Sequence, residues 1–138
     1  MMDSRSLRNL SGVHTDLALV IQKAFESIAS DSHITFKVTE GVRTMQRQKE
    51  LYAAKKTKTL KTRHITENNE CEQSCAVDVV AIVDGQVSWD FIHYLTLSKY
   101  IKAAAEVLHV PIVWGGDWKS FKDGPHFQLS EVAYPMKK

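Results

Sequence analysis

Two long stretches of the chain carry apolar residues at the spacing of an amphipathic helix. The first predicts a helix over about residues 13–29, and Thr15 or Asp16 is placed to support its start. The second predicts a helix over about residues 91–109. The apolar positions are Val13, Leu17, Val20, Ile21, Ala24, Phe25 and Ile28 in the first, and Phe91, Tyr94, Leu95, Leu97, Tyr100, Ile101, Ala104, Ala105 and Leu108 in the second.

Alternating and continuous apolar patterns predict the strands. Residues 76–83 are rich in β-branched side chains and indicate a buried strand, and Asp84-Gly85 after them is a hairpin turn signal. The other expected strands cover residues 34–39, 86–89, 111–114 and 127–129. Helices and antiparallel strands in this mixed order predict an α+β fold, a small single domain in which two long helices pack on an antiparallel sheet.

A shorter and more polar segment lies between the first two strands. We expect a short helix over about residues 44–54, with Met45, Leu51 and Tyr52 on one side. Residues 55–62 then indicate an exposed basic loop, either solvated or in contact with an anionic polymer.

The composition is that of an ordinary globular domain. Of the 138 residues, 43% are hydrophobic and 25% are charged, which argues against a disordered, collagen-like or coiled-coil chain. No internal repeat or linker is visible, so residues 1–138 are expected to form one domain. A formal net charge of +2 is too small for a protein that holds nucleic acid by bulk charge, and no nucleic-acid partner is expected.

The start of the chain and the cysteines indicate the cellular setting. No apolar run follows the first charged residues, and the longest apolar stretch, residues 76–83, is interrupted by Asp78. We therefore expect neither a secretory signal nor a membrane span, and we expect synthesis in a reducing cytosol. That setting favours free thiols at Cys71 and Cys75, with a local disulfide after release and a metal site as the alternatives.

Three places carry candidate chemistry. Asp78 is a carboxylate inside an apolar strand, where it must be paired (with an arginine, for example), hydrogen-bonded or bound to a metal. His64 precedes a polar loop that leads into this strand, and Asp123 and His126 stand three apart in a turn that opens the last strand. A single histidine is more often a surface or core residue than a ligand. No special role is expected for the other histidines, which are His14, His33, His93 and His109.

The combination of these residues is more specific than each alone. Two histidines and one aspartate supply the protein ligands of an open zinc site, which leaves a fourth position for water. Zinc acidifies such a water and polarises a substrate carbonyl. A carboxylate that is not a ligand must then take the proton and pass it to the leaving amine, and Asp123 is placed for this task beside His126.

Several short segments carry a resemblance to a known family. The segments TRHIT (62–66), CAVDV (75–79) and DGPHF (123–127) resemble the motif pieces of LAS-type zinc peptidases. This family includes D-alanyl-D-alanine carboxypeptidases and dipeptidases, and phage L-alanyl-D-glutamate endopeptidases that cut cell-wall peptides. EGVRT (40–44) and GGDW (115–118) resemble two further elements, so the likeness spans most of the chain. The compact chain without a signal peptide most resembles the phage endolysin branch.

The resemblance implies a role for each matching residue. The implied zinc ligands in the cleft are His64, Asp78 and His126, with Asp123 as the general base. Arg43 is implied to bind a substrate carboxylate or to steady the oxyanion of the tetrahedral intermediate, and a structural ion pair is the alternative. Trp114 either lines the cleft or belongs to the core.

Two departures from the family pattern concern the first ligand segment. The family spaces its histidine and aspartate by six residues, whereas thirteen residues separate His64 from Asp78. The seven extra residues fall within residues 67–75, a polar insertion that can loop out at modest entropic cost. Thr62 replaces the usual serine of the family and keeps the hydroxyl group.

The insertion has candidate roles of its own. It carries acidic side chains, asparagines and both cysteines beside the expected zinc site. The candidate roles are a lid, a substrate-selecting loop, a disulfide-gated flap or a weak cation site, and the alternative is a solvated loop without function. We expect oxidation of Cys71 and Cys75 to tighten the loop and to change activity.

The sequence therefore predicts a phage-type endolysin that acts as a monomer. Because the catalytic segments extend from residue 43 to residue 126, no separate wall-binding domain is expected. The expected reaction is zinc-dependent hydrolysis of the L-alanyl-D-glutamate bond in the peptidoglycan stem peptide. The alternatives are a D,D-carboxypeptidase or dipeptidase on the same scaffold and a non-catalytic wall-binding module. The family implies that the enzyme reaches the wall through a pore made by another phage protein. A basic patch that holds an anionic wall near the cleft is expected from Lys55, Lys56, Lys58, Lys61 and Arg63.

Overall fold

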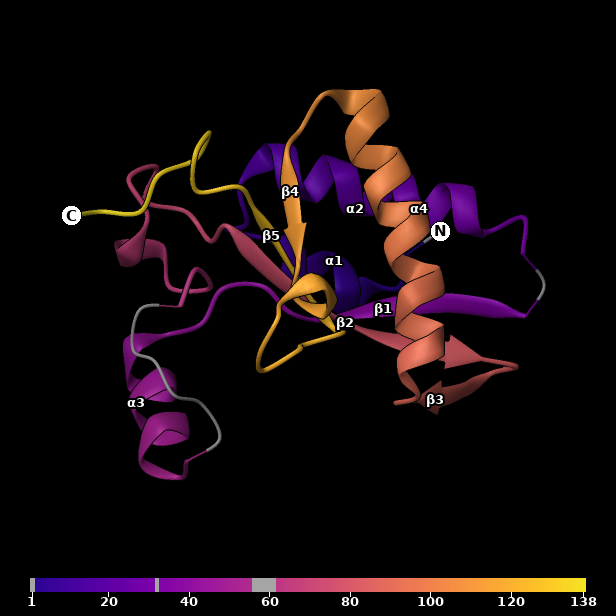
Figure 1. Ribbon diagram of the computed structural model, residues 1–138, viewed down its shortest axis with the longest axis horizontal. Helices are drawn as coiled ribbons and strands as arrows, with labels where there is room; N and C mark the ends of the chain where they lie inside the picture. Colours follow the sequence, from indigo (N-terminus) through magenta and orange to yellow (C-terminus); the bar gives the residue numbers. More distant parts are fainter. Residues whose placement is uncertain (1, 32, 56–61) are drawn as a thin grey trace.

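The computed structural model describes residues 2–31, 33–55 and 62–138, and its centre is an antiparallel sheet of five strands (Figure 1). The strands lie in the order β1-β2-β5-β4, and β3 pairs with β2 as well. Their bounds are β1 Ile34–Glu40, β2 Ala76–Val83, β3 Gln86–Ser88, β4 Ile112–Trp114 and β5 His126–Leu129. The helices are α1 Ser4–Leu10, α2 Thr15–Ile28, α3 Met45–Ala53 and α4 Phe91–Leu108, with short 3-10 turns η1 Thr66–Asn68 and η2 Gly115–Asp117. Within this described part, no helix is both long and apolar enough to cross a membrane.

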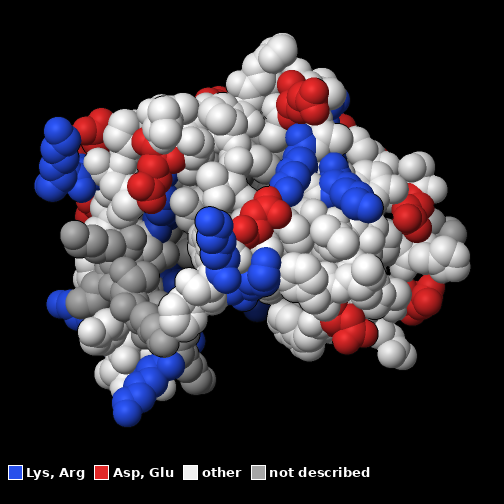
Figure 2. Space-filling view, in the orientation of Figure 1, with Lys and Arg blue, Asp and Glu red and all other residues white. Residues whose placement is uncertain are grey.

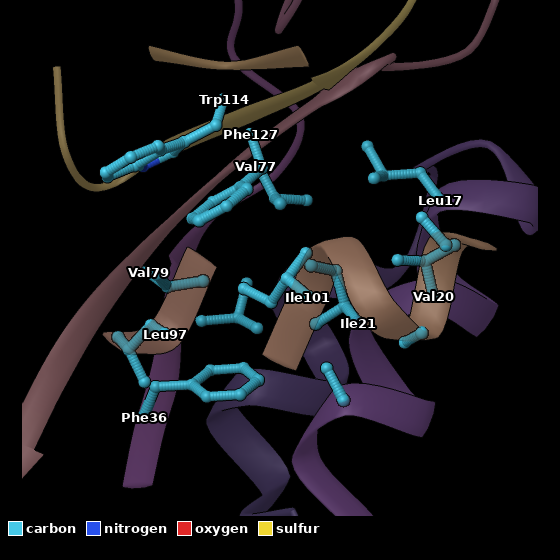
Figure 3. Packing of buried hydrophobic residues seen from close by; sticks show 14 of the residues in the cluster. Leu17, Val20, Ile21, Phe36, Val77, Val79, Leu97, Ile101, Trp114 and Phe127 are labelled. Atoms are coloured by element: carbon cyan, nitrogen blue, oxygen red, sulfur yellow. The ribbon is translucent and has the colours of Figure 1, made fainter. Parts of the chain in front are cut away.

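The two long helices α2 and α4 pack together on one face of the sheet (Figures 1 and 3). Because side chains alternate along a strand, one face of β1, β2 and β5 points toward these helices. The resulting core contains Leu17, Val20 and Ile21 of α2, Leu97 and Ile101 of α4, and Phe36, Val77, Val79 and Phe127 of the sheet. The predicted α+β fold, with two long helices on an antiparallel sheet, is confirmed.

Polar side chains gather on the opposite face of the sheet. Asp78 of β2 and His126 and Gln128 of β5 alternate with the buried Val77 and Phe127, so they point away from the core. The register pairs Asp78 with His126 directly across the two strands. Strand β5 begins one residue earlier than expected, which puts His126 on a hydrogen-bonded strand and not in the preceding turn.

The sequence patterns did not predict helix α1. Asp3 caps this helix, because its carboxylate accepts a hydrogen bond from Ser6 N at 2.8 Å. The helix lies along the edge strand β1. There Ser6 Oγ accepts a hydrogen bond from Val38 N at 3.0 Å, and Asn9 Nδ2 donates to Val38 O at 2.8 Å. These bonds satisfy edge backbone groups that would otherwise be open to another strand.

Local hydrogen bonds and turns set the ends of two other elements. The N-cap of α2 is His14, whose Nδ1 accepts a hydrogen bond from Asp16 N at 3.1 Å. Asp16 lies in the first turn, where an acidic side chain favours the start of a helix, so the expected support comes from Asp16 while His14 is the N-cap. Asp84 and Gly85 both have positive φ, as a type I′ hairpin turn requires, and they join β2 to β3 as predicted.

Helix α3 occurs where the sequence predicts it but has a different inner face. Its one buried residue is Gln48, whereas Tyr52 is half exposed. The expected apolar side is wrong, because α3 stands away from the main sheet and its inner side chain makes a polar contact described below (Figure 1). Residues 56–61 of the expected basic loop lie outside the described residues.

Candidate metal centre and cleft

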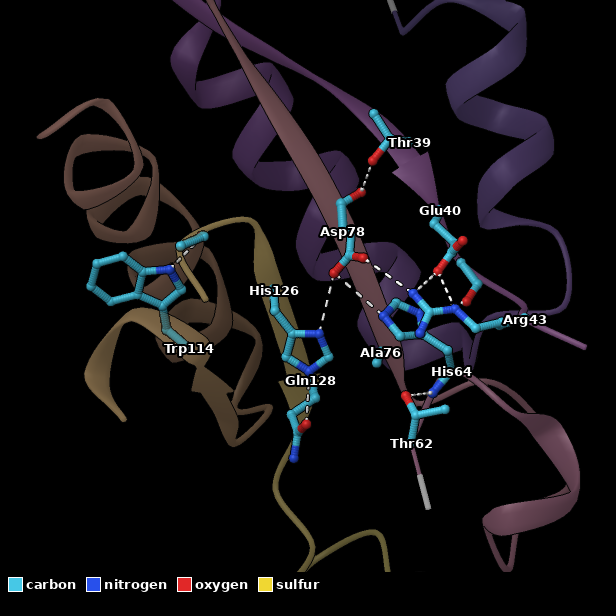
Figure 4. Close-up of polar contacts among 12 residues, drawn as sticks. Thr39, Glu40, Arg43, Thr62, His64, Ala76, Asp78, Trp114, His126 and Gln128 are labelled. Atoms are coloured by element: carbon cyan, nitrogen blue, oxygen red, sulfur yellow. Dashed lines mark hydrogen bonds and ion pairs between the residues drawn. The ribbon is translucent and has the colours of Figure 1, made fainter. Parts of the chain in front are cut away.

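Three side chains from three segments meet on the polar face of the sheet (Figure 4). Asp78 and His126 occupy paired positions of β2 and β5, and His64 comes from the loop before η1. One donor atom from each residue lies within 4.8 Å of the other two. Within residues 2–31, 33–55 and 62–138 this is the only such group of His, Cys, Asp and Glu side chains, and neither cysteine belongs to it. The structure therefore brings together the three residues that the sequence predicts as ligands.

His64 is fully buried, and a backbone carbonyl orients its ring. Nδ1 donates a hydrogen bond to Gly41 O at 2.8 Å, so the lone pair stays on Nε2. Nε2 lies 3.3 Å from Asp78 Oδ1, and it is buried without a hydrogen-bond partner in the described structure. A buried lone pair that faces a carboxylate is unfavourable by itself. A cation bound between the two groups removes that cost.

His126 presents its other nitrogen to the same carboxylate. Nδ1 lies 3.2 Å from Asp78 Oδ1, and Nε2 donates to Gln128 Oε1 at 2.8 Å. Burial lowers the pKa of His126, but the hydrogen bond and charge of Asp78, together with Gln128, raise it above its usual value. The ring packs against the rings of His64 and Trp118, each with a centroid separation of 5.2 Å.

The three donor atoms fit a zinc ion. Two imidazole nitrogens and one carboxylate oxygen are ligands that zinc prefers, and three protein ligands leave a coordination position open to the cleft. Burial alone raises the pKa of Asp78, but the hydrogen bond from His126 and the nearby His64 hold it well below its usual range. The carboxylate is therefore ionised and ready to bind a cation.

Asp123 faces the same cleft as the three candidate ligands. The residues that line this cleft are Arg43, Thr62, Arg63, His64, Asp78, Trp118, Asp123, His126, Gln128 and Glu131. Burial, and then the charge of Asp78, raises the pKa of Asp123 above its usual value. Its backbone is fixed, because Asp123 N donates to Gly115 O at 3.0 Å and Asp123 O accepts from His126 N at 3.2 Å. A fixed carboxyl group with raised proton affinity suits general base catalysis beside a metal.

Arg43 approaches Asp78 from the side of β1 and is held by two residues that the sequence analysis missed. Glu40 Oε1 accepts hydrogen bonds from Nε and Nη2, and Gln48 Oε1 accepts from Nη1 at 2.8 Å. Nη2 also lies 3.6 Å from Asp78 Oδ2. Arg43 therefore takes part in a structural ion pair and also lines the cleft, and its expected contact with the substrate stays a prediction. The sequence feature that could have indicated this contact is a polar residue, Gln48, on the inner side of a short helix.

Trp118, and not Trp114, forms the aromatic wall of the cleft. Trp114 is 2% exposed, donates from Nε1 to Gly124 O at 2.7 Å and stacks near Phe127. Trp118 lines the cleft and packs on His126. The core alternative for Trp114 is thus confirmed. Trp118 follows η2 outside any strand, where side-chain alternation gives no signal.

The insertion at residues 67–75 folds away from the cleft. Asn69 is fully buried, and its amide nitrogen donates to three backbone carbonyls, one of them the carbonyl of Arg63. A hydrogen bond from Lys137 N to Asn68 O at 2.8 Å ties the segment to the C-terminal residues. None of residues 67–75 lines the cleft. The structure therefore gives no support to a lid or a substrate-selecting loop here.

Arg63 is buried and does not belong to a surface patch. It is 3% exposed, and it donates from Nε to Asn69 Oδ1 at 3.0 Å, from Nη1 to Leu129 O at 3.0 Å, and from Nη2 to Tyr134 O. The expectation that Arg63 joins a basic patch is wrong, because these acceptors hold the guanidinium inside. Of the other patch residues, Lys55 is exposed, and Lys56, Lys58 and Lys61 lie outside the described residues.

Two glycines allow backbone segments to approach closely at the site. A Cβ atom at Gly41 would lie 2.0 Å from Asn9 O, and the carbonyl of Gly41 is the one that orients His64. A Cβ atom at Gly115 would lie 2.3 Å from Asp123 O. Both sites of close approach therefore require glycine for steric reasons.

Comparisons with known proteins place this arrangement among peptidases. Residues 1–130 match the family described as phage L-alanyl-D-glutamate peptidase. The chain is similar to the peptidoglycan L-alanyl-D-glutamate endopeptidase CwlK of Bacillus subtilis, with 28% identity over 126 residues that cover 85% of this chain and 75% of that protein. It is also similar to the crystal structure of the L-Ala D-Glu endopeptidase ChiX of Serratia marcescens, with 41% identity, a TM-score of 0.83, and coverage of 96% and 91% of the two chains. A variant of the D,D-pentapeptidase VanY in complex with Zn(II) shares the fold, with a TM-score of 0.53 at 16% identity over 85% of this chain and 72% of that chain.

Proposed function

Because the chain belongs to the phage L-alanyl-D-glutamate peptidase family and is a peptidoglycan endopeptidase, we propose that it cuts the L-alanyl-D-glutamate bond at a zinc ion held by His64, Asp78 and His126. The observation that carries the metal site is the buried Nε2 of His64, which lacks a hydrogen-bond partner among the described residues and lies 3.3 Å from Asp78 Oδ1. When bound, zinc supplies the Lewis acidity that polarises the substrate carbonyl and lowers the pKa of the attacking water.

Asp123 is the proton carrier in this proposal. Its carboxylate lines the cleft with the three ligands, and it takes a proton from the attacking water. The same carboxyl group then donates that proton to the departing nitrogen of D-glutamate. The raised pKa of Asp123 suits this double role, because the group must hold the proton between the two transfers.

Arg43 stabilises negative charge next to the reacting carbonyl. Glu40 and Gln48 fix its guanidinium in the cleft wall, so its position needs no reorganisation during the reaction. Charge that develops on the carbonyl oxygen is stabilised by this fixed cation. Trp118 covers the other side of His126 and limits the access of water to that ligand.

The substrate is the peptidoglycan stem peptide, and we propose that residues 1–138 act on it as a single peptidase domain and as a monomer. The enzyme is made in the cytosol and reaches the wall through a membrane pore. Similarity to the phage family supports this route.

A digest of purified peptidoglycan tests the proposed function. Protein is assayed as prepared, after removal of metal by a chelator, and after zinc is added back. We expect new N-terminal D-glutamyl ends by mass spectrometry, their loss after chelation and their return with zinc. Release of D-alanine in their place would identify a D,D-peptidase, and full cleavage by verified metal-free protein would contradict the zinc site.

A pair of histidine variants provides the matched control. His126→Ala should lose both bound zinc and cleavage, whereas His33→Ala should keep both, because the His33 side chain is 78% exposed and pairs with Asp84 far from the cleft lining.

A further inference from the structure

Gln128 is the neighbour of His126 on the polar face of β5, two positions along the strand. Its Oε1 lies 2.8 Å from His126 Nε2, which is the nitrogen turned away from Asp78 (Figure 4). We propose that Gln128 is a positioning residue that fixes the ring of His126 so that Nδ1 points at the metal. This inference rests on the proposed zinc site and adds a residue to which neither the family motif nor the sequence patterns give a role.

Both ring nitrogens of His126 face an acceptor oxygen. An amide oxygen is only an acceptor, so the contact with Gln128 places a hydrogen on Nε2 of His126. Asp78 Oδ1, at 3.2 Å, is also only an acceptor and faces Nδ1. When a cation occupies the position between Nδ1 and Asp78, the hydrogen on Nδ1 must leave. The hydrogen on Nε2 remains, held by Gln128.

His64 has the same arrangement, with the roles of Nδ1 and Nε2 exchanged. There the acceptor is Gly41 O, which takes the hydrogen from Nδ1 of His64 and leaves Nε2 facing Asp78. Each candidate histidine ligand thus has one nitrogen toward Asp78 and the other on a fixed oxygen. Acceptors of this kind orient metal-binding histidines and increase their basicity. Only the acceptor at His126 is a side chain, so only this one can be removed by substitution.

Packing does not supply the same restraint. Trp118 and His64 contact the ring of His126 from other directions, but ring contacts do not select which nitrogen faces Asp78. A flip of the ring about the Cβ–Cγ bond would turn Nδ1 away from Asp78 and put the carbon atom Cδ2 in its place. The hydrogen bond to Gln128 opposes such a turn. Gln128 itself is only half-buried, so its side chain is not part of the core.

The test compares zinc affinity among three variants. Q128L removes the acceptor, Q128E keeps an acceptor oxygen, and Q86L is the matched control on the exposed strand β3. Affinity is measured without substrate, by competition with a chromophoric chelator. We expect Q128L to bind zinc about 10- to 100-fold more weakly than the unmodified protein. Q128E and Q86L should retain the affinity.

A second readout follows the ring of His126 in the zinc-bound protein. Nitrogen-15 NMR detects the hydrogen on Nε2 and measures how fast it exchanges with water. This exchange should be slow in the unmodified protein and in Q128E, where an oxygen at position 128 holds the hydrogen, and it should be faster in Q128L.

Two results would overturn the inference. One is unchanged zinc affinity in Q128L. The other is an equal loss in Q128L and Q128E with both proteins folded, which would assign the effect to packing. Because neither readout uses the substrate, a protein that binds zinc in this manner but leaves peptidoglycan intact would refute the proposed function and keep the role of Gln128.

Discussion

Each side chain in the cleft is effective because a neighbour fixes one of its atoms. His64 is held through Nδ1 by a backbone carbonyl, Arg43 is held by Glu40 and Gln48, and Asp123 is held through its own backbone. The Nε2 atom of His64 is thereby directed toward Asp78, and the side chains of Arg43 and Asp123 line the cleft. Substitutions at this scale should therefore separate metal binding, catalysis and stability from one another.

Replacement of Asp123 by alanine should separate catalysis from metal binding. The carboxylate is not among the three candidate ligands, so Asp123→Ala should keep about the same zinc content. The rate of peptidoglycan cleavage should fall by about 10²- to 10⁴-fold, because a general acid–base group is lost. Metal analysis and a rate measurement on the same preparation check this outcome. Full activity in this variant would refute the proton-transfer role.

Replacement of Gly41 by alanine should destabilise the fold. A Cβ atom there meets the backbone oxygen of Asn9 at 2.0 Å, and a backbone atom cannot rotate aside as a side chain can. We expect a loss of about 1–3 kcal/mol in the free energy of unfolding, measured by urea denaturation. The control is Val42→Ala, because Val42 is 42% exposed. Equal stability of Gly41→Ala and the unmodified protein would show that α1 moves away without cost.

At the scale of elements, pairing between β2 and β5 creates the site. Asp78 and His126 are far apart in the chain but directly opposite in the register, and both lie on the polar face. The insertion at residues 67–75 leaves this pairing undisturbed. Asn69 binds Arg63, and Arg63 in turn donates to the carbonyls of Leu129 and Tyr134. The seven additional residues between His64 and Asp78 are thus accommodated outside the sheet.

The insertion is where we expect a redox effect. Cys71 Sγ and Cys75 Sγ lie 3.5 Å apart, and a disulfide requires an approach to about 2.05 Å. Burial, followed by the contact with Cys71, raises the pKa of the Cys75 thiol to about 12, so the exposed Cys71 is the thiol that meets an external oxidant. Oxidised glutathione would exchange with Cys71, and Cys75 would then displace glutathione, with two glutathione thiols released for each disulfide formed.

Oxidation should tighten residues 67–75 and change the rate of cleavage. Mass spectrometry identifies the two redox forms, limited proteolysis measures the tightening, and a peptidoglycan digest measures the rate. Cys71→Ser is the control that cannot close the bond. Identical protease sensitivity and identical rates of the two verified forms would exclude a redox role for the pair.

Charged side chains are spread over the surface of the molecule, whereas the three candidate metal ligands meet at one place. Basic and acidic side chains are interspersed over the face shown in Figure 2, in keeping with the formal net charge of +2. The three candidate ligands join two neighbouring strands and the loop before η1, so a bound zinc links segments from residues 64 to 126. Metal binding should therefore stabilise the domain as a unit.

Zinc should raise the melting temperature of the protein. With free zinc at 100 times its dissociation constant, binding to the folded state alone adds about 2.7 kcal/mol. For a domain of this size that corresponds to a rise of roughly 5–10 °C, measured by differential scanning calorimetry with zinc and with a chelator. His126→Ala should lose the rise. A melting temperature independent of zinc would show that no such link forms.

Much of the fold could be predicted because its signals are local. Apolar periodicity located α2 and α4, β-branched content located β2, and the Asp84-Gly85 pair located the hairpin. Helix α1 was missed because it is short, and its role depends on contacts with β1 that are distant in sequence. The inner face of α3 was misjudged because Gln48 is buried by a partner, Arg43, and not by its own hydrophobicity.

The sequence by itself determined the residue types of the site. An aspartate in an apolar strand needs a partner, and two histidines with that aspartate form a zinc donor set. Tertiary structure alone decided which nitrogen of each ring faces Asp78, since that depends on Gly41 O and Gln128 Oε1. It also decided that Trp118 lines the cleft, that Arg63 is buried and that the insertion folds away from the cleft. These features arise from contacts between segments distant in the chain, and a residue's local pattern does not encode its partners.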